Sequence, residues 1–262
     1  MKVLKTVGRL MYNTFNLNGP DGYLARIESD LQGKLVKRLS KGAYGEVWSF
    51  RSSKKNMANR RLVVKIMKVE NSQDVAIMDN EVTVGTNPKI GGVVGPKIYK
   101  NTYDMVPFKA NVYQFYVMDD VRSRASNTAT TLYDYVQGSR PGTCRRIPPA
   151  FYNKLSNILK KMYDAGFYHG DLHGDNVMVV NDKEGNVKSV KIIDYGAFRP
   201  FQKGKSLRNK CLVNLLRRVH QDFKMSNNTS LQPFQSGRIL YSLKNFFIFF
   251  KFLFKEKKKK KK

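Results

Sequence analysis

A polar loop joined to an apolar hairpin occupies residues 169–196 and limits the folds open to this chain. The loop reads HGDLHGDN (169–176) and holds two of the three histidines of the chain. The run VMVV follows, then the turn NDKEGN, then the second run VKSVKIIDYG. Runs of branched residues on both sides of a glycine-containing turn predict a β-hairpin. The loop itself is a divalent-metal cluster, a phosphoryl-transfer loop or a plain polar turn.

The spacing of the polar residues favours phosphoryl transfer. Asp171 and Asn176 share the loop, and Asp194 follows the second strand of the hairpin. One carboxylate can orient a hydroxyl group and accept its proton, while an amide oxygen and a second carboxylate hold divalent cations on nucleotide phosphates. A zinc or di-metal hydrolase is the alternative, and His220 is the one histidine left to complete its ligands. The hydrolase hypothesis leaves the glycine turn, Lys65 and Glu81, which are described next, without a role.

The segment 33–119 predicts a sheet with one helix. Strands are expected at 34–40, 45–50, 61–69, 95–100 and 111–120, where branched or aromatic residues alternate with turns. Apolar residues at helical spacing predict a helix over 75–85. The sequence SKGAYGEVW puts Gly42 and Gly45 in the first turn, where backbone N–H groups can approach phosphate oxygens. A plain two-glycine hairpin is the alternative.

A lysine inside an apolar strand points to a buried anion. Lys65 lies in VVKIM, and burying an ammonium group is unfavourable unless it finds a counter-charge. Glu81 on the expected helix is the candidate partner, and Glu70 is its rival. The alternative is an edge strand with Lys65 and Lys68 on its solvent face.

Beyond Asp120 the pattern becomes more helical. Helices are expected at 130–136, at 147–166 (with prolines at its start and Gly166 at its end) and at 211–223, and a linker at 226–237. The sequence therefore predicts an α+β chain. We divide it into an N-terminal extension (1–32), a sheet-rich unit (33–119), a helical unit (120–225) and a basic, aromatic tail (226–262).

Over most of residues 33–200, the motifs and their order along the chain resemble those of the protein-kinase superfamily. SKGAYGEVW is similar to the glycine-rich loop, VVKIM to the strand with the phosphate-pairing lysine, HGDLHGDN to the catalytic loop and DYG to D-F-G. HGDLH-x-x-N resembles the serine/threonine protein kinases of large DNA viruses of the iridovirus and ascovirus type, and the same form occurs in aminoglycoside phosphotransferases and RIO-like kinases. The resemblance implies a two-lobed kinase-like fold, with a small antiparallel-sheet N-lobe holding one helix and a mainly helical, shortened C-lobe.

The resemblance also implies a role for each site residue. Asp171 would orient the acceptor hydroxyl, Lys65 held by Glu81 would pair with the ATP phosphates, and His173 would stand near the transferred phosphate. Asn176 and Asp194 would bind Mg²⁺ or Mn²⁺. The remaining ATP-binding positions are Ser40, Gly42, Gly45 and Val47 at the glycine turn, and Met118, Asp119 and Val121 at the hinge that receives adenine.

Three features depart from the superfamily pattern. Gly170 replaces the arginine that grips a phosphorylated activation loop in many kinases, so control by loop phosphorylation is not expected. His173 replaces a lysine. No A-P-E sequence follows DYG, and the chain after Gly196 is short, so the peptide-binding platform is expected to be missing, reduced or rebuilt.

The expected activity is transfer of the γ-phosphate of ATP to a Ser or Thr hydroxyl of a protein substrate. A small-molecule kinase of the aminoglycoside type, a nucleotide-binding pseudokinase, and a nucleic-acid or membrane binder are the alternatives.

Charge favours contact with a polyanion or an acidic membrane face. The chain has 48 Lys and Arg against 20 Asp and Glu, a net charge of +28, to which the terminal KEKKKKKK adds only a part. Cys144 and Cys211 suggest neither a disulfide framework nor zinc-ligand pairs. No signal peptide or transmembrane run is recognised, so a cytoplasmic location is expected, or the infected host cell or virion if the protein is viral. The Phe/Lys-rich segment 239–254 is expected to lie on a membrane, to pack on the body of the protein, or to have no function.

Overall fold

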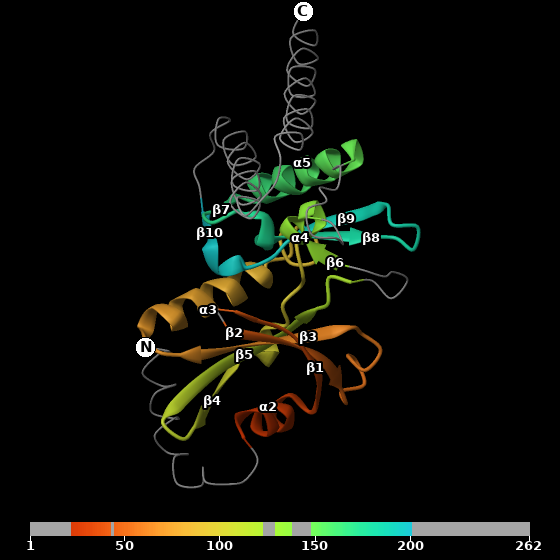
Figure 1. The fold of residues 1–262 in the computed structure, drawn as a ribbon. Coiled ribbons are helices and arrows are strands. Elements are labelled where there is room, and N and C mark those ends of the chain that lie inside the picture. The colour runs from red at the N-terminus through yellow and green to blue at the C-terminus, as the bar shows by residue number, and fades with distance from the viewer. Residues whose placement is uncertain (1–21, 43–44, 123–128, 138–147, 201–262) are drawn as a thin grey trace, which may run out of the picture.

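A five-stranded antiparallel sheet forms one part of the molecule (Figure 1). The computed structural model describes residues 22–42, 45–122, 129–137 and 148–200. The strand order is β1-β2-β3-β5-β4, so β3, which carries Lys65, lies at the centre. The strands are β1 (Gly33–Gly42), β2 (Gly45–Ser52), β3 (Leu62–Val69), β4 (Asp104–Phe108) and β5 (Asn111–Asp119).

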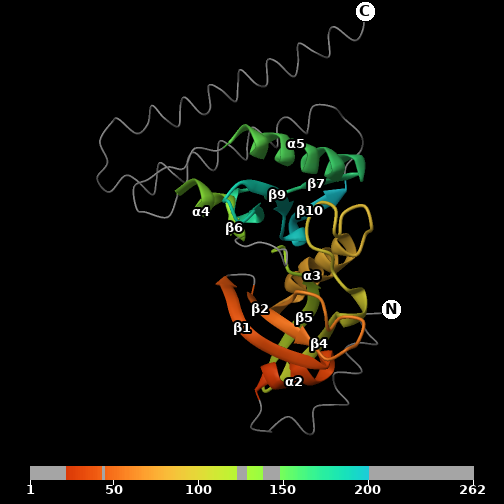
Figure 2. The same ribbon diagram turned by 90° about the vertical axis from the view of Figure 1, so that its right-hand side faces the viewer.

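Two helices cover opposite faces of this sheet (Figures 1 and 2). They are α2 (Tyr23–Leu31) and α3 (Ser72–Gly85). Ile27 and Leu31 of α2 lie in a core with Phe50 and Phe115 of the sheet. Met78 of α3 lies in a second core that continues into the rest of the molecule. Helix α3 therefore joins the sheet to the part that follows.

The part of the chain beyond residue 120 combines two helices with small sheets (Figure 2). Helix α5 follows the helical spacing expected from the sequence and buries Phe151, Leu155 and Leu159 in the core shared with α3. The elements are β6 (Ala129–Thr131), α4 (Leu132–Gln137), α5 (Pro149–Asp164), β7 (Phe167–His169), β8 (Val177–Asn181), β9 (Val187–Ile192) and β10 (Phe198–Pro200). Strands β6, β8 and β9 form one sheet, and β7 pairs with β10.

Most of the expected elements are confirmed: the strands at 34–40, 45–50, 61–69 and 111–120, the helices at 75–85 and 147–166, and the hairpin of β8 and β9. The strand expected at 95–100 is wrong, since Ile98 forms only an isolated bridge to Met118. The sheet is completed instead by β4. Helix α2 was not expected, and it lies inside the range assigned to an extension.

The described residues beyond 120 are mixed, with five short strands beside the two helices, rather than mainly helical as expected. The predicted helix at 211–223, the linker at 226–237, the Phe/Lys-rich segment, Cys144, Cys211 and His220 lie outside the described residues.

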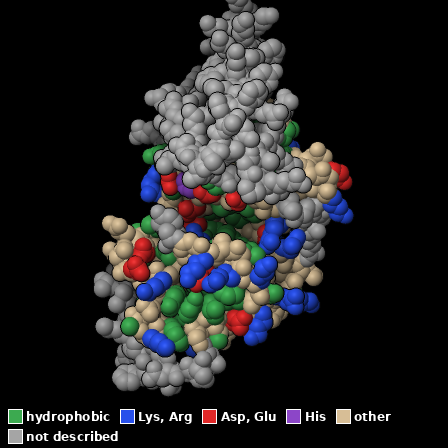
Figure 3. All heavy atoms as spheres, in the orientation of Figure 1, with side chains coloured by type: hydrophobic (Ala, Val, Ile, Leu, Met, Phe, Trp, Pro, Cys, Tyr) green, Lys and Arg blue, Asp and Glu red, His purple; other side chains and the backbone are tan. Residues whose placement is uncertain are grey.

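Basic side chains gather over the sheet part (Figure 3). Between residues 34 and 61 the one acidic residue is Glu46, against Lys34, Lys37, Arg38, Lys41, Arg51, Lys54, Lys55, Arg60 and Arg61. Among the described helices, none has the length and apolar character needed to span a bilayer.

Candidate active site

The register of the large sheet aligns several of the predicted nucleotide-binding residues. Ser40 is opposite Val47, Val47 is opposite Lys65, and Lys65 is opposite Tyr116. Directly opposed residues of antiparallel strands project from the same face, so these four form one row across β1, β2, β3 and β5. Met118 lies two residues after Tyr116 and therefore projects from the same face. This is the face that α3 partly covers.

The two glycines at the ends of β1 and β2 have different surroundings. Gly45 has a φ of +110°, and a Cβ atom there would lie 2.1 Å from the carbonyl oxygen of Ile66, so only glycine fits. A Cβ atom on Gly42 would meet nothing within 4 Å. Packing against β3 thus explains Gly45, whereas the open space at Gly42 is what a close approach by a ligand requires.

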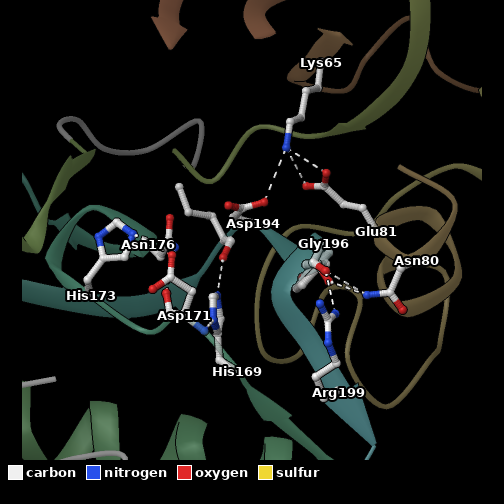
Figure 4. A network of polar contacts seen from close by, with 12 residues as sticks. Lys65, Asn80, Glu81, His169, Asp171, His173, Asn176, Asp194, Gly196 and Arg199 are labelled. Atoms are coloured by element: carbon white, nitrogen blue, oxygen red, sulfur yellow. Dashed lines mark hydrogen bonds and ion pairs between the residues drawn. The ribbon is translucent and has the colours of Figure 1, made fainter. Parts of the chain in front are cut away.

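The ammonium group of Lys65 has two acidic neighbours (Figure 4). Its Nζ donates to the carboxylate oxygens of Glu81 at 2.9 and 2.7 Å and lies 3.5 Å from Oδ1 of Asp194. Lys65 is 8% exposed and Glu81 is 3% exposed. Burial lowers the pKa of Lys65, but the carboxylates of Glu81 and Asp194 raise it more, so the net shift is upward and the group is a cation at neutral pH. The rival Glu70 pairs instead with Lys68 at the surface.

The loop between β7 and β8 brings Asp171, His173 and Asn176 together (Figure 4). The amide nitrogen of Asn176 donates to the backbone oxygen of Asp171 and contacts Nε2 of His173, both at 3.0 Å. The same Nε2 lies 3.6 Å from Oδ2 of Asp171. The hydrogen bond to the backbone oxygen of Asp171 fixes the orientation of the Asn176 amide, whose oxygen is a suitable ligand for a hard cation. The side chain of Asp171 is 53% exposed and thus accessible from solvent.

His169 links this loop to the segment that carries Asp194. Its Nδ1 accepts from the backbone N–H of Asp171 at 3.1 Å, and its Nε2 lies 3.1 Å from the backbone oxygen of Ile193. An acceptor at Nδ1 and a donor at Nε2 define a neutral imidazole. Burial lowers the pKa of His169, and it outweighs the opposing effects of the Ile193 carbonyl and of the carboxylates of Asp194 and Asp171.

Because folding keeps His169 neutral, the free energy of unfolding is expected to fall as the pH drops below 6.5. In this range the unfolded state takes up a proton that the folded state does not bind. For one titrating group, the free energy of unfolding changes by at most about 1.4 kcal/mol per pH unit. Denaturation curves between pH 7.5 and 5 measure it, and the His169→Asn variant should show the shallower dependence. Equal slopes for the two proteins would contradict the assignment.

Asp194 has an uncommon backbone conformation, with φ 62° and ψ 68°, in the left-handed region. A residue with a Cβ atom rarely adopts it, and such conformations are concentrated at functional sites. The backbone N–H of the preceding Ile193 donates to the backbone oxygen of Asn176 at 3.0 Å. This bond brings the chain at Asp194 beside Asn176, so the two predicted cation ligands come from neighbouring backbones.

The predicted hinge lies at the end of β5. The Asp119 side chain accepts from the hydroxyl of Tyr99 at 2.6 Å, and the backbone N–H groups of Asp119 and Asp120 donate to Lys97 and Arg61. Val121 follows and is half-buried.

The surface is hollowed between the sheet part and the part above it, with acidic side chains at the upper rim (Figure 3). Among the described residues, no group of three or more His, Cys, Asp or Glu side chains is arranged to hold a metal ion. The ligand cluster of the hydrolase alternative is thus not present in that part of the chain. Asn176 and Asp194 fit a different kind of site, in which Mg²⁺ takes its remaining ligands from phosphates and water.

Two residues with hydrogen bonds next to Asp194 were given no role in the sequence analysis: His169, described above, and Asn80, whose Nδ2 donates to the backbone oxygen of Tyr195 at 3.2 Å. His169 opens the HGD motif, which is a signal of its own, whereas Asn80 stands before Glu81 without any pattern that marks it. No protein-family model matches the chain, and no curated protein matches it.

Proposed function

We propose that this chain is an ATP-dependent phosphotransferase with a two-lobed, protein-kinase-like arrangement, which transfers the γ-phosphate to a Ser or Thr hydroxyl of a protein. One observation carries the proposal. A buried, charged lysine meets Asp194 at 3.5 Å, and His169 ties the chain next to Asp194 to the backbone of Asp171. Three groups from distant parts of the sequence thus come together: Lys65 as the partner of phosphates, Asp194 as the ligand of a metal ion and Asp171 as the accessible carboxylate.

In this mechanism each group has one task. Lys65, oriented by Glu81, pairs with phosphate oxygens, and the adenine lies near Met118, Asp119 and Val121. The hydroxyl oxygen of the acceptor attacks the γ-phosphorus, the bond to the β–γ bridging oxygen breaks, and the hydroxyl proton passes to Asp171. Positioning and charge neutralisation supply the acceleration, since the protein itself forms no covalent bond.

Asn176 and Asp194 are the residues that would hold Mg²⁺ or Mn²⁺. When bound, the ion neutralises charge on the phosphate oxygens. His173 accepts from the backbone N–H of Asp175 through its Nδ1, and its Nε2 lies beside Asp171, 3.6 Å from Oδ2.

A phosphate-transfer assay tests the proposal. Purified protein is incubated with Mg²⁺, γ-labelled ATP and three acceptor sets: a dephosphorylated cell lysate, a basic model protein and a panel of aminoglycosides. We expect label on Ser or Thr residues of proteins and none when EDTA removes the metal. Label on aminoglycosides alone identifies a small-molecule kinase instead. Metal-dependent ATP binding without any transfer identifies a pseudokinase.

A further inference from the structure

One amide ties the helix that carries Glu81 to the segment after Asp194 (Figure 4). Nδ2 of Asn80 donates to the backbone oxygens of Tyr195, Gly196 and Phe198 at 3.2, 3.0 and 3.1 Å. These three acceptors lie more than a hundred residues later in the chain. The side chain of Asn80 is half-buried, so water competes only partly for these bonds.

Gly196 brings the same segment against α3. A Cβ atom at Gly196 would lie 2.7 Å from Cγ2 of Ile77, one turn of α3 before Glu81. A larger residue at Gly196 would therefore push the segment away from the helix. The close approach places the backbone oxygen of Gly196 within reach of Asn80.

The segment that Asn80 holds begins with the left-handed residue Asp194. On its N-terminal side, Ile193 is fixed by Asn176 and His169. On its C-terminal side, Arg199 also donates to the oxygens of Gly196 and Phe198, but Arg199 belongs to the same segment and cannot anchor it to another element. Other elements also hold this segment: the Tyr195 hydroxyl donates to the backbone oxygen of Pro96, the backbone N–H of Gly170 donates to that of Ala197, and β10 pairs with β7. The Asn80 amide is the side-chain anchor that α3 adds. An unfavourable φ persists only where surrounding contacts hold it.

We propose that Asn80 is a positioning residue that keeps Asp194 in its left-handed conformation, with its carboxylate beside Lys65. Because Asn80 and Glu81 are adjacent on one helix, a single rigid element fixes both acidic neighbours of Lys65. These contacts of the site all lie within the described part of the chain. This inference rests on the proposed phosphotransferase function and adds the residue that makes the cation ligand Asp194 competent.

Two variants of Asn80 test the inference. Asn80→Ala removes the donor, and Asn80→Asp keeps the shape but sets carboxylate oxygens against three carbonyl oxygens. We expect kcat to fall about 10-fold in the first and about 100-fold in the second, the range found for residues that orient metal ligands. The Mg²⁺ concentration for half-maximal rate should rise, while the KM for ATP changes less than kcat because Lys65 and Glu81 stay in place. Thr83→Ala, an exposed change on the same helix, is the matched control and should behave as the wild type.

Hydrogen exchange supplies a measurement that does not depend on catalysis. The backbone amides of residues 195–199 should exchange faster in both variants, and those of β8 should not change. Thermal melting first establishes that each variant is folded; if Asn80→Asp does not fold, Asn80→Ala decides. Wild-type exchange, kcat and Mg²⁺ dependence in Asn80→Ala would overturn the inference. If the wild type transfers no phosphate, the proposed function fails, and the exchange data alone decide whether Asn80 holds the segment.

Discussion

Replacing Asp171 with Asn is expected to lower the rate of phosphate transfer by about 10³-fold and to leave the affinity for MgATP nearly unchanged. The amide cannot accept the proton of the acceptor hydroxyl, and general-base catalysis typically contributes factors of this order. The side chain of Asp171 is 53% exposed, so an acceptor can reach it, and the phosphate-pairing role belongs to Lys65. The effect should therefore appear in kcat, and titration with a fluorescent ATP analogue should give the wild-type dissociation constant.

Asp175→Asn is the matched control for this change. Asp175 lies in the same loop, is 60% exposed, and has its carboxylate 3.6 Å from Nδ1 of His173. The control removes the same charge from the same loop, so a general electrostatic effect would lower the rate in both variants. We expect Asp175→Asn to stay within about threefold of the wild type, as is usual for exposed charges. Equal losses in the two variants would remove Asp171 from the mechanism.

The central strands and the large helices could be predicted because their hydrophobic patterns agree with their burial. The run at β3 is apolar on both faces, as expected for a strand at the centre of a sheet. Strand β4 was missed because Pro107 and Asp104 make its sequence look like a loop. The structure places β4 at the edge of the sheet, where a residue without an N–H group is tolerated. Helix α2 was missed although Ile27 and Leu31 have helical spacing, since Gly22 provides no side-chain cap.

Only those residues of the site that belong to local sequence motifs could be predicted. Asp171, His173 and Asn176 share one loop, and Lys65 with Glu81 follows from the cost of burying a charge. The bonds of Asn80 to residues 195–198 join segments far apart in the sequence, and an isolated Asn on a helix has no periodicity that reveals its partner. The left-handed Asp194 was equally hidden, because the chain on either side of it is contacted by the HGDLHGDN stretch and by α3, which lie far from it in the sequence.

Removing one member of the Lys65–Glu81 pair is expected to destabilise the protein strongly. In Glu81→Leu the buried ammonium keeps only Asp194, at 3.5 Å, and in Lys65→Met the Glu81 carboxylate, 3% exposed, loses its partner. Leaving one charge of a buried pair uncompensated costs roughly 3–5 kcal/mol. Urea denaturation at neutral pH measures the loss, and both single variants should also lose phosphate transfer.

The double variant Lys65→Met/Glu81→Leu separates stability from catalysis. Apolar side chains of similar volume often replace a buried ion pair without loss, so its free energy of unfolding should return to within about 1 kcal/mol of the wild type. It should nevertheless transfer no phosphate, since it lacks the cation for the phosphate oxygens.

The pKa of Lys65 is raised above 10.5 in the folded protein. The contribution of the Lys65–Glu81 pair to the free energy of unfolding is therefore complete below that pH and is lost as the pH rises through the folded pKa. That alkaline loss should be absent from the double variant. A double variant as unstable as the single ones would show that packing rather than charge governs this position, and one that still transferred phosphate would exclude Lys65 from the mechanism.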